Sequence, residues 1–206
     1  GLLFERTYEI DDGYMITATQ RVTNTKKKSV GLFPYGLIAR SGTPNTLGFY
    51  ILHEGPLGVF NDTLREYDYD DLQETRKVEV QSTGGWIGIT DKYWLAALVP
   101  DQSVGSTYRF VHSLKNKDDR YQVDCLGQET RIAVGQQIET VNRLFAGAKE
   151  VKLLDTYSEQ YGIKNFDLAV DFGWFYFLTK PFFYAISWLN TYLGNFGLAI
   201  IAFTVF

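Results

Sequence analysis

The C-terminal part of the chain differs sharply in polarity from the part before it. After Asp171 the only charged side chain is that of Lys180, and Trp, Phe, Tyr, Leu and Ile predominate. An aromatic, almost uncharged stretch that leads into an apolar run is typical of a helix on a bilayer surface followed by the start of a membrane span. The chain therefore divides into a polar body and an apolar tail, and the tail predicts that the body is held at a membrane.

The tail is expected to contain two helices joined by a corner. A helix over residues 174–192 turns about 100° per residue, which gathers its polar side chains into one narrow stripe. That stripe consists of Thr179, Lys180, Ser187, Asn190 and Thr191. The Gly-Asn-Phe-Gly sequence at 194–197 predicts the corner. The 11 residues from Phe196 onward, at about 1.5 Å each, reach about 17 Å of a hydrocarbon core of about 30 Å, so they predict a truncated span.

We predict two sets of membrane-contacting side chains in this tail. The interface set is Trp174, Phe175, Phe177, Lys180, Phe182, Trp188 and Tyr192, and the set that starts the span is Phe196, Leu198, Ile200, Ile201 and Phe203. Pro181 either kinks the first helix or occupies its first turn. The alternative is a buried helix pair of a soluble protein, but the many aromatic side chains and the scarcity of charge favour the membrane.

The body is predicted to be mainly β and antiparallel. Residues 14–24 alternate apolar and polar side chains, as a strand with one solvated face does. They would form a hairpin with residues 2–10 through a turn in which Gly13 supplies a positive φ. Further strands are expected at 30–40, 58–61, 75–81, 85–90, 94–99, 106–114, 120–126, 128–134 and 137–146. Many short strands without helical patterns between them favour a β-sandwich.

One amphipathic helix is expected to close the body. Ala148, Val151, Leu154 and Tyr157 recur at helical spacing within residues 148–161. Residues 162–167 then predict a linker. The sequence thus predicts a β-sandwich domain over 1–165, a membrane-interfacial segment over 166–193 and the start of a transmembrane helix over 194–206.

Composition argues against several kinds of site. A net charge of -4 does not suit a nucleic-acid surface, which needs a basic face. Cys125 is the only cysteine and His53 and His112 are the only histidines, so neither a disulfide nor a His or Cys metal motif is predicted. His53 and Glu54 could form an acid-base pair, but the Gly-Pro that follows favours a surface loop. The acidic residues at 68–71 lack calcium-loop spacing and predict a solvated loop.

Two further motifs have a structural interpretation that we favour. The three lysines at 26–28 could contact anionic lipid headgroups, yet their place between two strands favours a charged hairpin tip. The Gly-Gly-Trp at 84–86 lacks the Lys and the hydroxyl residue of a phosphate loop. It predicts a strand entry with Trp86 buried.

Five segments carry a family resemblance. They are Gly-Gly-Trp-Ile-Gly-Ile-Thr-Asp-Lys-Tyr-Trp at 84–94, Phe-Ala-Gly-Ala-Lys-Glu at 145–150, Asp-Phe-Gly-Trp at 171–174, Lys-Pro at 180–181 and Gly-Asn-Phe-Gly at 194–197. In this order and spacing they resemble the YidC membrane protein insertases of Gram-negative bacteria. The similarity covers the whole chain.

The resemblance implies an antiparallel β-supersandwich, similar to mutarotase-like sandwiches, with a C-terminal amphipathic helix, then an interfacial helix and a truncated transmembrane helix. It implies a location in the bacterial inner membrane, with residues 1–165 in the periplasm. Members insert and fold inner-membrane proteins, alone or with the Sec translocon. The implied partners are therefore the lipid bilayer, nascent inner-membrane proteins and Sec translocon components, with no cofactor, no nucleic acid and no enzymatic activity.

The resemblance also limits what this chain is expected to do. Relative to the family, it lacks the first transmembrane segment, the opening strands of the periplasmic domain and the insertion groove, whose basic residue is expected beyond residue 206. The chain is thus predicted to be a periplasmic scaffold and interaction domain. The alternative is a carbohydrate-binding or mutarotase-like sandwich, suggested by Trp86, Tyr93 and Trp94. Such an enzyme needs convergent His and acidic groups, and His53 and His112 alone offer little support.

Overall fold

The computed structural model describes residues 1–46, 52–173 and 175–205 and forms two compact units, Gly1–Val170 and Asp171–Phe206. We call them the body and the helical unit. The boundary falls after Val170 and not after residue 165, because Ile163, Phe166 and Ala169 are buried in the core of the body. Residues 162–167 are therefore not a free linker. The left-handed Gly162 (φ 63°) ends a helix, and the chain then turns back onto the body.

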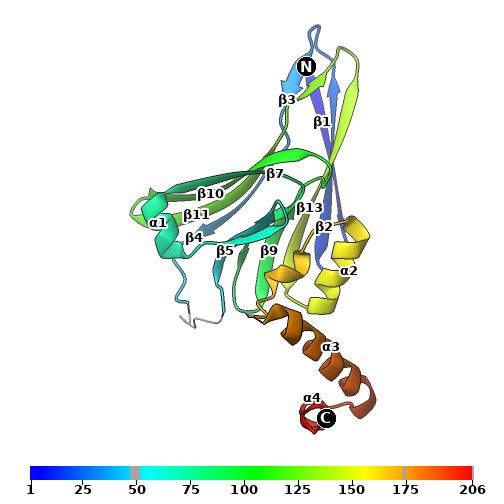
Figure 1. The fold of residues 1–206 in the computed structure, drawn as a ribbon. Coiled ribbons are helices and arrows are strands. Elements are labelled where there is room, and N and C mark those ends of the chain that lie inside the picture. Colours follow the sequence, from blue (N-terminus) through cyan, green and yellow to red (C-terminus); the bar gives the residue numbers. More distant parts are fainter. Residues whose placement is uncertain (47–51, 174, 206) are drawn as a thin grey trace. The chain divides into compact units, whose positions relative to one another are not determined.

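The described part of the body contains two antiparallel sheets and a short ribbon (Figure 1). In spatial order the large sheet consists of β1 (Leu2–Ile10), β2 (Met15–Asn24), β13 (Gln137–Ala148), β9 (Trp94–Val99), β8 (Trp86–Thr90), β5 (Gly55–Phe60) and β6 (Thr63–Glu66). The small sheet consists of β4 (Tyr35–Ser41), β11 (Asp118–Gly127), β10 (Gly105–Lys115) and β7 (Lys77–Thr83). The ribbon pairs β12 (Thr130–Ile132) with β3 (Val30–Leu32).

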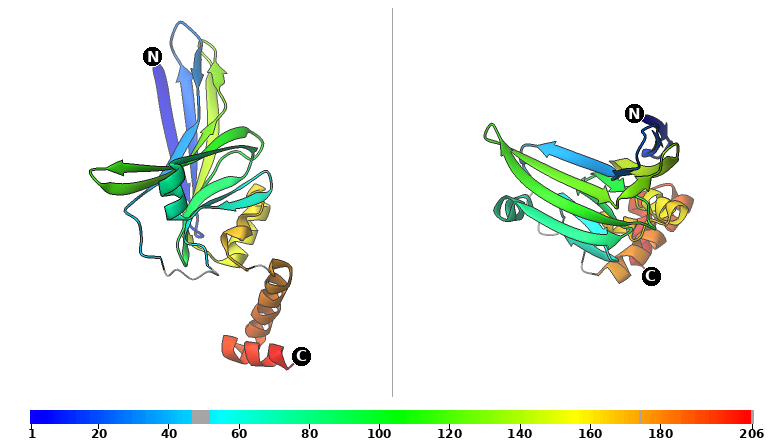
Figure 2. Two further views of the ribbon diagram at one scale, coloured as in Figure 1. Left: turned by 60° about the vertical axis from the view of Figure 1, so that its left-hand side comes forward. Right: turned by 90° about the horizontal axis from the view of Figure 1, so that it is seen from above.

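Helices occur in both units. The body contains α1 (Tyr69–Thr75), α2 (Val151–Tyr161) and the 3₁₀ helix η1 (Phe166–Ala169). The helical unit contains α3 (Tyr176–Leu193) and α4 (Phe196–Thr204). Figure 2 shows the small sheet on one side of the large sheet, with α2 and η1 on the other side. The large sheet is therefore the middle layer of the body.

Two apolar clusters hold these layers together. Between the large sheet and the helices, Phe166 lies edge-on to Trp86 and to Phe145, with ring centroids 5.4 Å and 5.7 Å away. Between the two sheets, Phe60 of the large sheet packs against Tyr108 of the small sheet at 4.8 Å. Side chains that alternate along a strand point to opposite faces, so the large sheet is buried on both faces where these clusters lie. The predicted antiparallel β-sandwich is confirmed.

Three details of the predicted secondary structure were wrong. The strand expected over 30–40 is broken between β3 and β4 at Phe33 and Pro34, since proline has no N–H to donate to a ladder. β6 was not expected. The acidic residues 68–71 do not form a loop. Asp68 occupies the N-cap position of α1 without a side-chain cap hydrogen bond. The first turn of α1 carries Asp70 and Asp71, where negative charge interacts favourably with the helix dipole.

The turn between β1 and β2 also differs from expectation. Tyr14, and not Gly13, adopts a positive φ, at 71°. Asp11 organises the turn, because its Oδ1 accepts hydrogen bonds from the backbone N–H groups of Gly13 (3.0 Å) and Met15 (2.9 Å) and from the hydroxyl of Tyr157 in α2 (2.7 Å). Position 13 needs glycine because a Cβ there would lie 2.2 Å from the Tyr157 hydroxyl. The hairpin is thereby fixed to α2.

Candidate membrane interface

The helical unit begins with a tight turn. The Gly173 N–H donates to the Asp171 carboxylate at 2.7 Å, and Gly173 has a φ of 70°. The Thr179 hydroxyl donates to the Phe172 carbonyl at 2.9 Å, across the first turn of α3. Glycine suits this position because its φ lies in the left-handed region. The Asp-Phe-Gly motif thus forms the turn that precedes α3.

The described aromatic side chains predicted for the interface are largely exposed on α3 or directly before it. Phe177, Tyr192 and Trp188 expose 75%, 74% and 60% of their surface, and Phe175 and Phe182 are exposed as well. Trp174 lies outside the described residues. Soluble proteins rarely expose so many large apolar side chains together, and such a surface marks an interaction site.

Lys180 is the only basic side chain on this helix. Its Nζ donates to the Tyr176 hydroxyl at 3.2 Å and lies 5.5 Å from the centre of the Tyr176 ring. A lysine stem can run along apolar surface while the ammonium group stays near water. The contact with Tyr176 therefore suits a cation at the level of the headgroups.

The predicted polar stripe is interrupted by packing between α3 and α4. Phe182 and Phe203 meet edge-on with ring centroids 5.1 Å apart, while Ser187 and Ala199 are buried. Phe203 is only partly exposed. Of the residues predicted to start the span, Phe196, Leu198, Ile200 and Ile201 remain exposed. The stripe therefore does not form a continuous solvated face.

The break between α3 and α4 lies within the predicted corner. Gly194 ends α3 in the left-handed conformation (φ 64°), and its N–H donates to the Asn190 carbonyl at 2.8 Å. Asn195 begins α4 as its N-cap, because its side-chain oxygen accepts from the N–H groups of Gly197 (2.8 Å) and Leu198 (3.2 Å). One residue pair thus ends one helix and starts the next.

Pro181 lies inside α3, which begins at Tyr176. This excludes the alternative in which proline occupies the first turn. Because Pro181 has no backbone N–H, it cannot donate the usual helical hydrogen bond to the Phe177 carbonyl.

Across the described ranges, we find no helix with both the length and the hydropathy needed to cross a membrane.

The residues that suggested a sugar site do not converge. Trp86 is fully buried in the core, as the Gly-Gly-Trp motif predicted, and cannot stack on a ligand, whereas Tyr93 and Trp94 are exposed. His53 hydrogen-bonds the Pro56 carbonyl (3.2 Å). In the described residues no group of three or more His, Cys, Asp or Glu side chains is arranged to hold a metal ion.

His112 belongs to a hydrogen-bonded network within the body. Because the Arg76 guanidinium can only donate, the 3.2 Å contact makes Nδ1 of His112 the acceptor, so Nε2 donates to Asp119 at 2.8 Å. The hydrogen bond from His112 is the largest cause of the lowered pKa of Asp119. Both ring nitrogens are engaged and the imidazole is buried, so His112 is not poised as a general base.

A cleft of about 270 Å³ lies between the two sheets. Its lining includes Tyr35, Leu98, Asp101, Cys125 and Asn142. Burial raises the pKa of the Cys125 thiol to about 11, so the only cysteine in the sequence is a poor nucleophile. Two acidic residues of the lining are engaged with neighbours, because Asp101 accepts hydrogen bonds from Ser103 and Glu139 accepts one from Arg21.

A comparison with protein families decides the identification. The family model described as "YidC periplasmic domain" matches residues 1–185. The chain belongs to this family. The resemblance predicted from the five motifs is confirmed, and the YidC periplasmic domain accounts for the whole body and most of α3.

Curated relatives agree with the family match. The chain is 44% identical to the membrane protein insertase YidC of Rickettsia canadensis (strain McKiel) over 206 residues, which are 100% of this chain and 37% of the relative. It is 45% identical to the membrane protein insertase YidC of Methylobacterium sp. (strain 4-46) over 215 residues, 34% of that protein. The chain thus spans about a third of the length of these YidC relatives.

Two solved structures show weaker similarity. A TPR-domain containing protein from Parabacteroides distasonis aligns with a TM-score of 0.46 and 12% identity over 71% of this chain and 30% of its own. A putative aldose 1-epimerase from Klebsiella pneumoniae aligns with a TM-score of 0.39 and 13% identity over 80% of this chain and 54% of its own.

Proposed function

We propose that this chain is the periplasmic scaffold of a membrane protein insertase, with α3 lying in the bilayer interface. The observation that most directly supports this role is the exposed aromatic surface of α3, which carries a single charge. The names of the YidC relatives support the insertase assignment. In this proposal, residues 176–193 are the interfacial segment and residues 194–206 begin the next transmembrane helix, in the bacterial inner membrane.

The partners follow from this role. The bilayer contacts Phe175, Phe177, Phe182, Trp188 and Tyr192. Nascent inner-membrane proteins are the substrates of the complete insertase, and Sec translocon components contact the body in the periplasm. The proposed role involves no bond chemistry, in keeping with the engagement of both ring nitrogens of the buried His112.

The size of the aromatic contribution makes the proposal measurable. Complete burial of one large apolar side chain is worth about 1.5–3 kcal/mol. Even partial insertion of Phe177, Trp188 and Tyr192 therefore amounts to several kcal/mol. A change of about 1.4 kcal/mol alters a partition coefficient tenfold, so removing the three aromatic groups should reduce binding by about a hundredfold or more.

Flotation with vesicles of phosphatidylethanolamine and phosphatidylglycerol tests this prediction. The variant Phe177→Ser/Trp188→Ser/Tyr192→Ser should remain with the soluble fraction, while the unchanged chain floats. A matched control replaces three exposed aromatic residues of the body by serine, namely Phe4, Tyr8 and Phe33, and should float like the unchanged chain. Equal flotation of the α3 variant and the unchanged chain would refute the interfacial role of α3.

A further inference from the structure

Four large apolar side chains are exposed at one end of the body. Ile10 and Tyr14 flank the turn between β1 and β2, and Tyr93 and Trp94 lie at the turn between β8 and β9. Ile10, Tyr93 and Trp94 expose 73%, 64% and 60% of their surface, and Tyr14 is exposed as well. We call these four residues the end patch.

Strand β13 brings the two turns together. Trp94 pairs with Ala148, at the last residue of β13. Two residues earlier, the Ala146 N–H donates to the Tyr14 carbonyl at 3.2 Å. A Cβ on Gly147, between them, would lie 2.8 Å from the Tyr14 side chain. The aromatic side chains from the two turns therefore border the same end of one strand.

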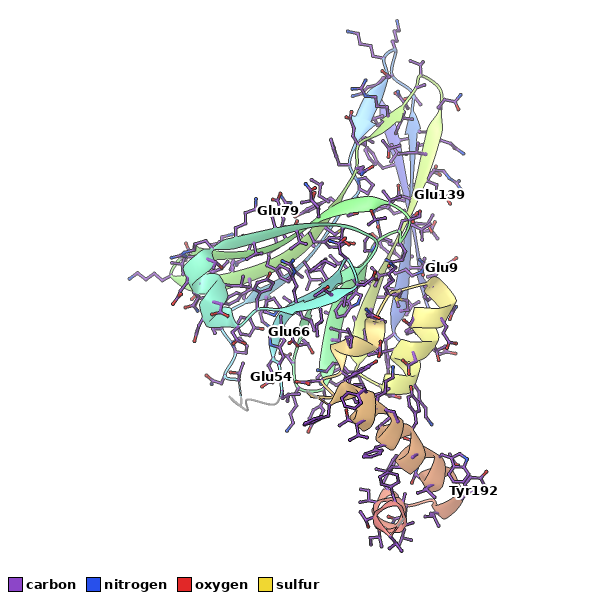
Figure 3. The ribbon with its side chains drawn as sticks, in the orientation of Figure 1. Glu9, Glu54, Glu66, Glu79, Glu139 and Tyr192 are labelled. Carbon is purple, nitrogen blue, oxygen red and sulfur yellow. The ribbon has the colours of Figure 1, made fainter. Side chains whose placement is uncertain are left out.

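The turn that carries Tyr93 and Trp94 is held rigidly. The Asp91 N–H donates to the Trp94 carbonyl, and the Lys149 N–H donates to the Tyr93 carbonyl, both at 2.9 Å. The Lys92 N–H donates to the carboxylate of Glu54 at 3.2 Å. Glu54, labelled in Figure 3, lies at this end of the body. A turn fixed by its own backbone can present aromatic groups without packing them against the core.

Both signs of charge occur around the end patch, since Asp11 and Asp12 lie in one of its turns and Asp91 and Lys92 in the other. Asp91 forms a bidentate pair with Arg40, with both N–O distances at 2.6 Å. Lys92 lies 5.1 Å from the centre of the Tyr93 ring. Lysine beside Tyr and Trp is typical of the headgroup level of membranes. Because the carboxylates of both turns oppose attraction to anionic headgroups, a contact with lipid would depend on the aromatic groups more than on lipid charge.

The last element of the body lies toward this same end. In Figure 1, η1 lies beside α2, toward the end at which β13 passes into α2. Only residues 171–175 separate the body from α3, and five residues span at most about 18 Å. This step rests on the proposed function, because α3 must lie in the bilayer for the tether to bring the end patch near lipid.

We propose that the end patch is a second membrane contact of this protein, with Tyr93 and Trp94 entering the headgroup region of a phospholipid bilayer. The contact limits how the body can tilt above the membrane. It holds the body at two places, through the tether after Val170 and through the β8–β9 turn.

Environment-sensitive fluorescence on the full chain tests this contact. A nitrobenzoxadiazole label is placed on Tyr93→Cys, on Tyr192→Cys in α3 and on Val134→Cys, an exposed control. Val134 lies just before β13, whose 12 residues separate it from the end patch by about 40 Å. Cys125 is buried and should not be labelled. Each protein is mixed with phosphatidylethanolamine and phosphatidylglycerol vesicles with and without quencher-labelled lipids.

We expect labels at 93 and 192 to shift to the blue and to be quenched by lipid, while the label at 134 does not respond. A response at 192 without one at 93 would overturn the second contact and leave the proposed function intact. Equal responses at 93 and 134 would indicate general adsorption and also overturn it. A response at 93 without one at 192 would support the end patch and contradict the proposed role of α3.

An equilibrium measurement supplies an independent check without a label. Tyr93→Ser/Trp94→Ser should weaken vesicle partitioning by about tenfold, and raising the salt concentration should change this difference little. The matched control Phe4→Ser/Tyr8→Ser removes two exposed aromatic groups from β1 and should leave partitioning unchanged. Equal losses in the two variants would contradict the proposal, and so would a difference that disappears in salt.

Discussion

Gly13 offers the sharpest test of how the β1–β2 turn is attached to the body. Replacing it by alanine places a Cβ 2.2 Å from the Tyr157 hydroxyl and 2.8 Å from a methyl group of Leu153. Because ordinary contacts lie at 3.4–4 Å, the Tyr157 hydroxyl must move by more than 1 Å. That movement breaks its 2.7 Å hydrogen bond to Asp11. Gly13 has no positive φ, so the backbone itself does not oppose the substitution.

The expected cost has two parts. Overpacking of this kind costs about 1–3 kcal/mol. Losing the hydrogen bond to the Asp11 carboxylate adds about 1 kcal/mol, less than the range of about 1.5–3 kcal/mol for a charged acceptor, because Asp11 is exposed to solvent. Gly13→Ala should therefore destabilise the body by about 2–4 kcal/mol. Tyr157→Phe alone should cost about 1 kcal/mol.

A double-mutant cycle measured by urea unfolding in mild detergent separates these parts. In Gly13→Ala/Tyr157→Phe the hydroxyl that causes the closest clash is gone, and the hydrogen bond is lost only once. The double variant should therefore be at least about 1 kcal/mol more stable than the sum of the single effects predicts. As a control, Gly36→Ala places a Cβ 3.5 Å from the nearest Leu98 methyl group and should change stability by less than about 0.5 kcal/mol. Strict additivity, or equal effects at positions 13 and 36, would refute the reasoning.

Three further predictions concern other parts of the chain. Phe166→Ala should lower the free energy of unfolding by about 3–5 kcal/mol, since the ring packs against Trp86; thermal unfolding measures this. Asn195→Ala should cost about 1 kcal/mol of α4 stability and speed amide exchange in its first turn. The hydrogen bond from Arg40 is the largest cause of the lowered pKa of Asp91. The stabilising effect of this hydrogen bond is complete above the ordinary aspartate pKa of about 3.9 and is lost as pH falls through the folded-state pKa. Asp91→Asn should therefore make the free energy of unfolding depend less on pH in the acid range, as urea unfolding at several pH values would measure.

Each of these predictions has a matched control. Phe33→Ala removes an exposed ring and should change stability by less than about 0.5 kcal/mol; a loss equal to that of Phe166→Ala would contradict the core position of Phe166. Thr191→Ala lies outside the α4 cap and should leave amide exchange in α4 unchanged. Asp12→Asn replaces an exposed carboxylate and should keep the low-pH dependence of the unchanged chain.

The larger part of the fold could be predicted because its strands carry clear period-two patterns. Along β10, buried Ser106, Tyr108, Phe110 and His112 alternate with less buried residues, and the turn residues between strands mark their ends. α1 escaped prediction because a helix of 7 residues shows too little helical periodicity. Its buried residues, Tyr69 and Leu72, define only one spacing. Position along the chain could not reveal that these two side chains are buried in the apolar cluster that contains Phe60 and Tyr108.

The aromatic and almost uncharged character of α3 is visible in the sequence, but the packing of its side chains is not. Lack of charge and many aromatic residues are properties of the sequence alone, and together they predict an interface. The burial of Ser187 depends on packing between α3 and α4, which no local pattern encodes. Phe166 was assigned to a linker because its neighbours are polar, and its place against Trp86 is a tertiary contact.

Rigidity links the attachment of the β1–β2 turn to the end patch. Ordering flexible side chains and loops on binding costs free energy, about 0.5–1.5 kcal/mol for each mobile side chain that becomes fixed. Asp11 and Tyr157 fix the turn next to Tyr14, while the hydrogen bonds of Asp91 fix the turn of Trp94. Both turns are thus ordered before any bilayer is met. A small aromatic surface can then contribute most of its burial energy to the contact. A variant that loosens either turn but keeps every aromatic residue should therefore bind lipid more weakly than the unchanged chain.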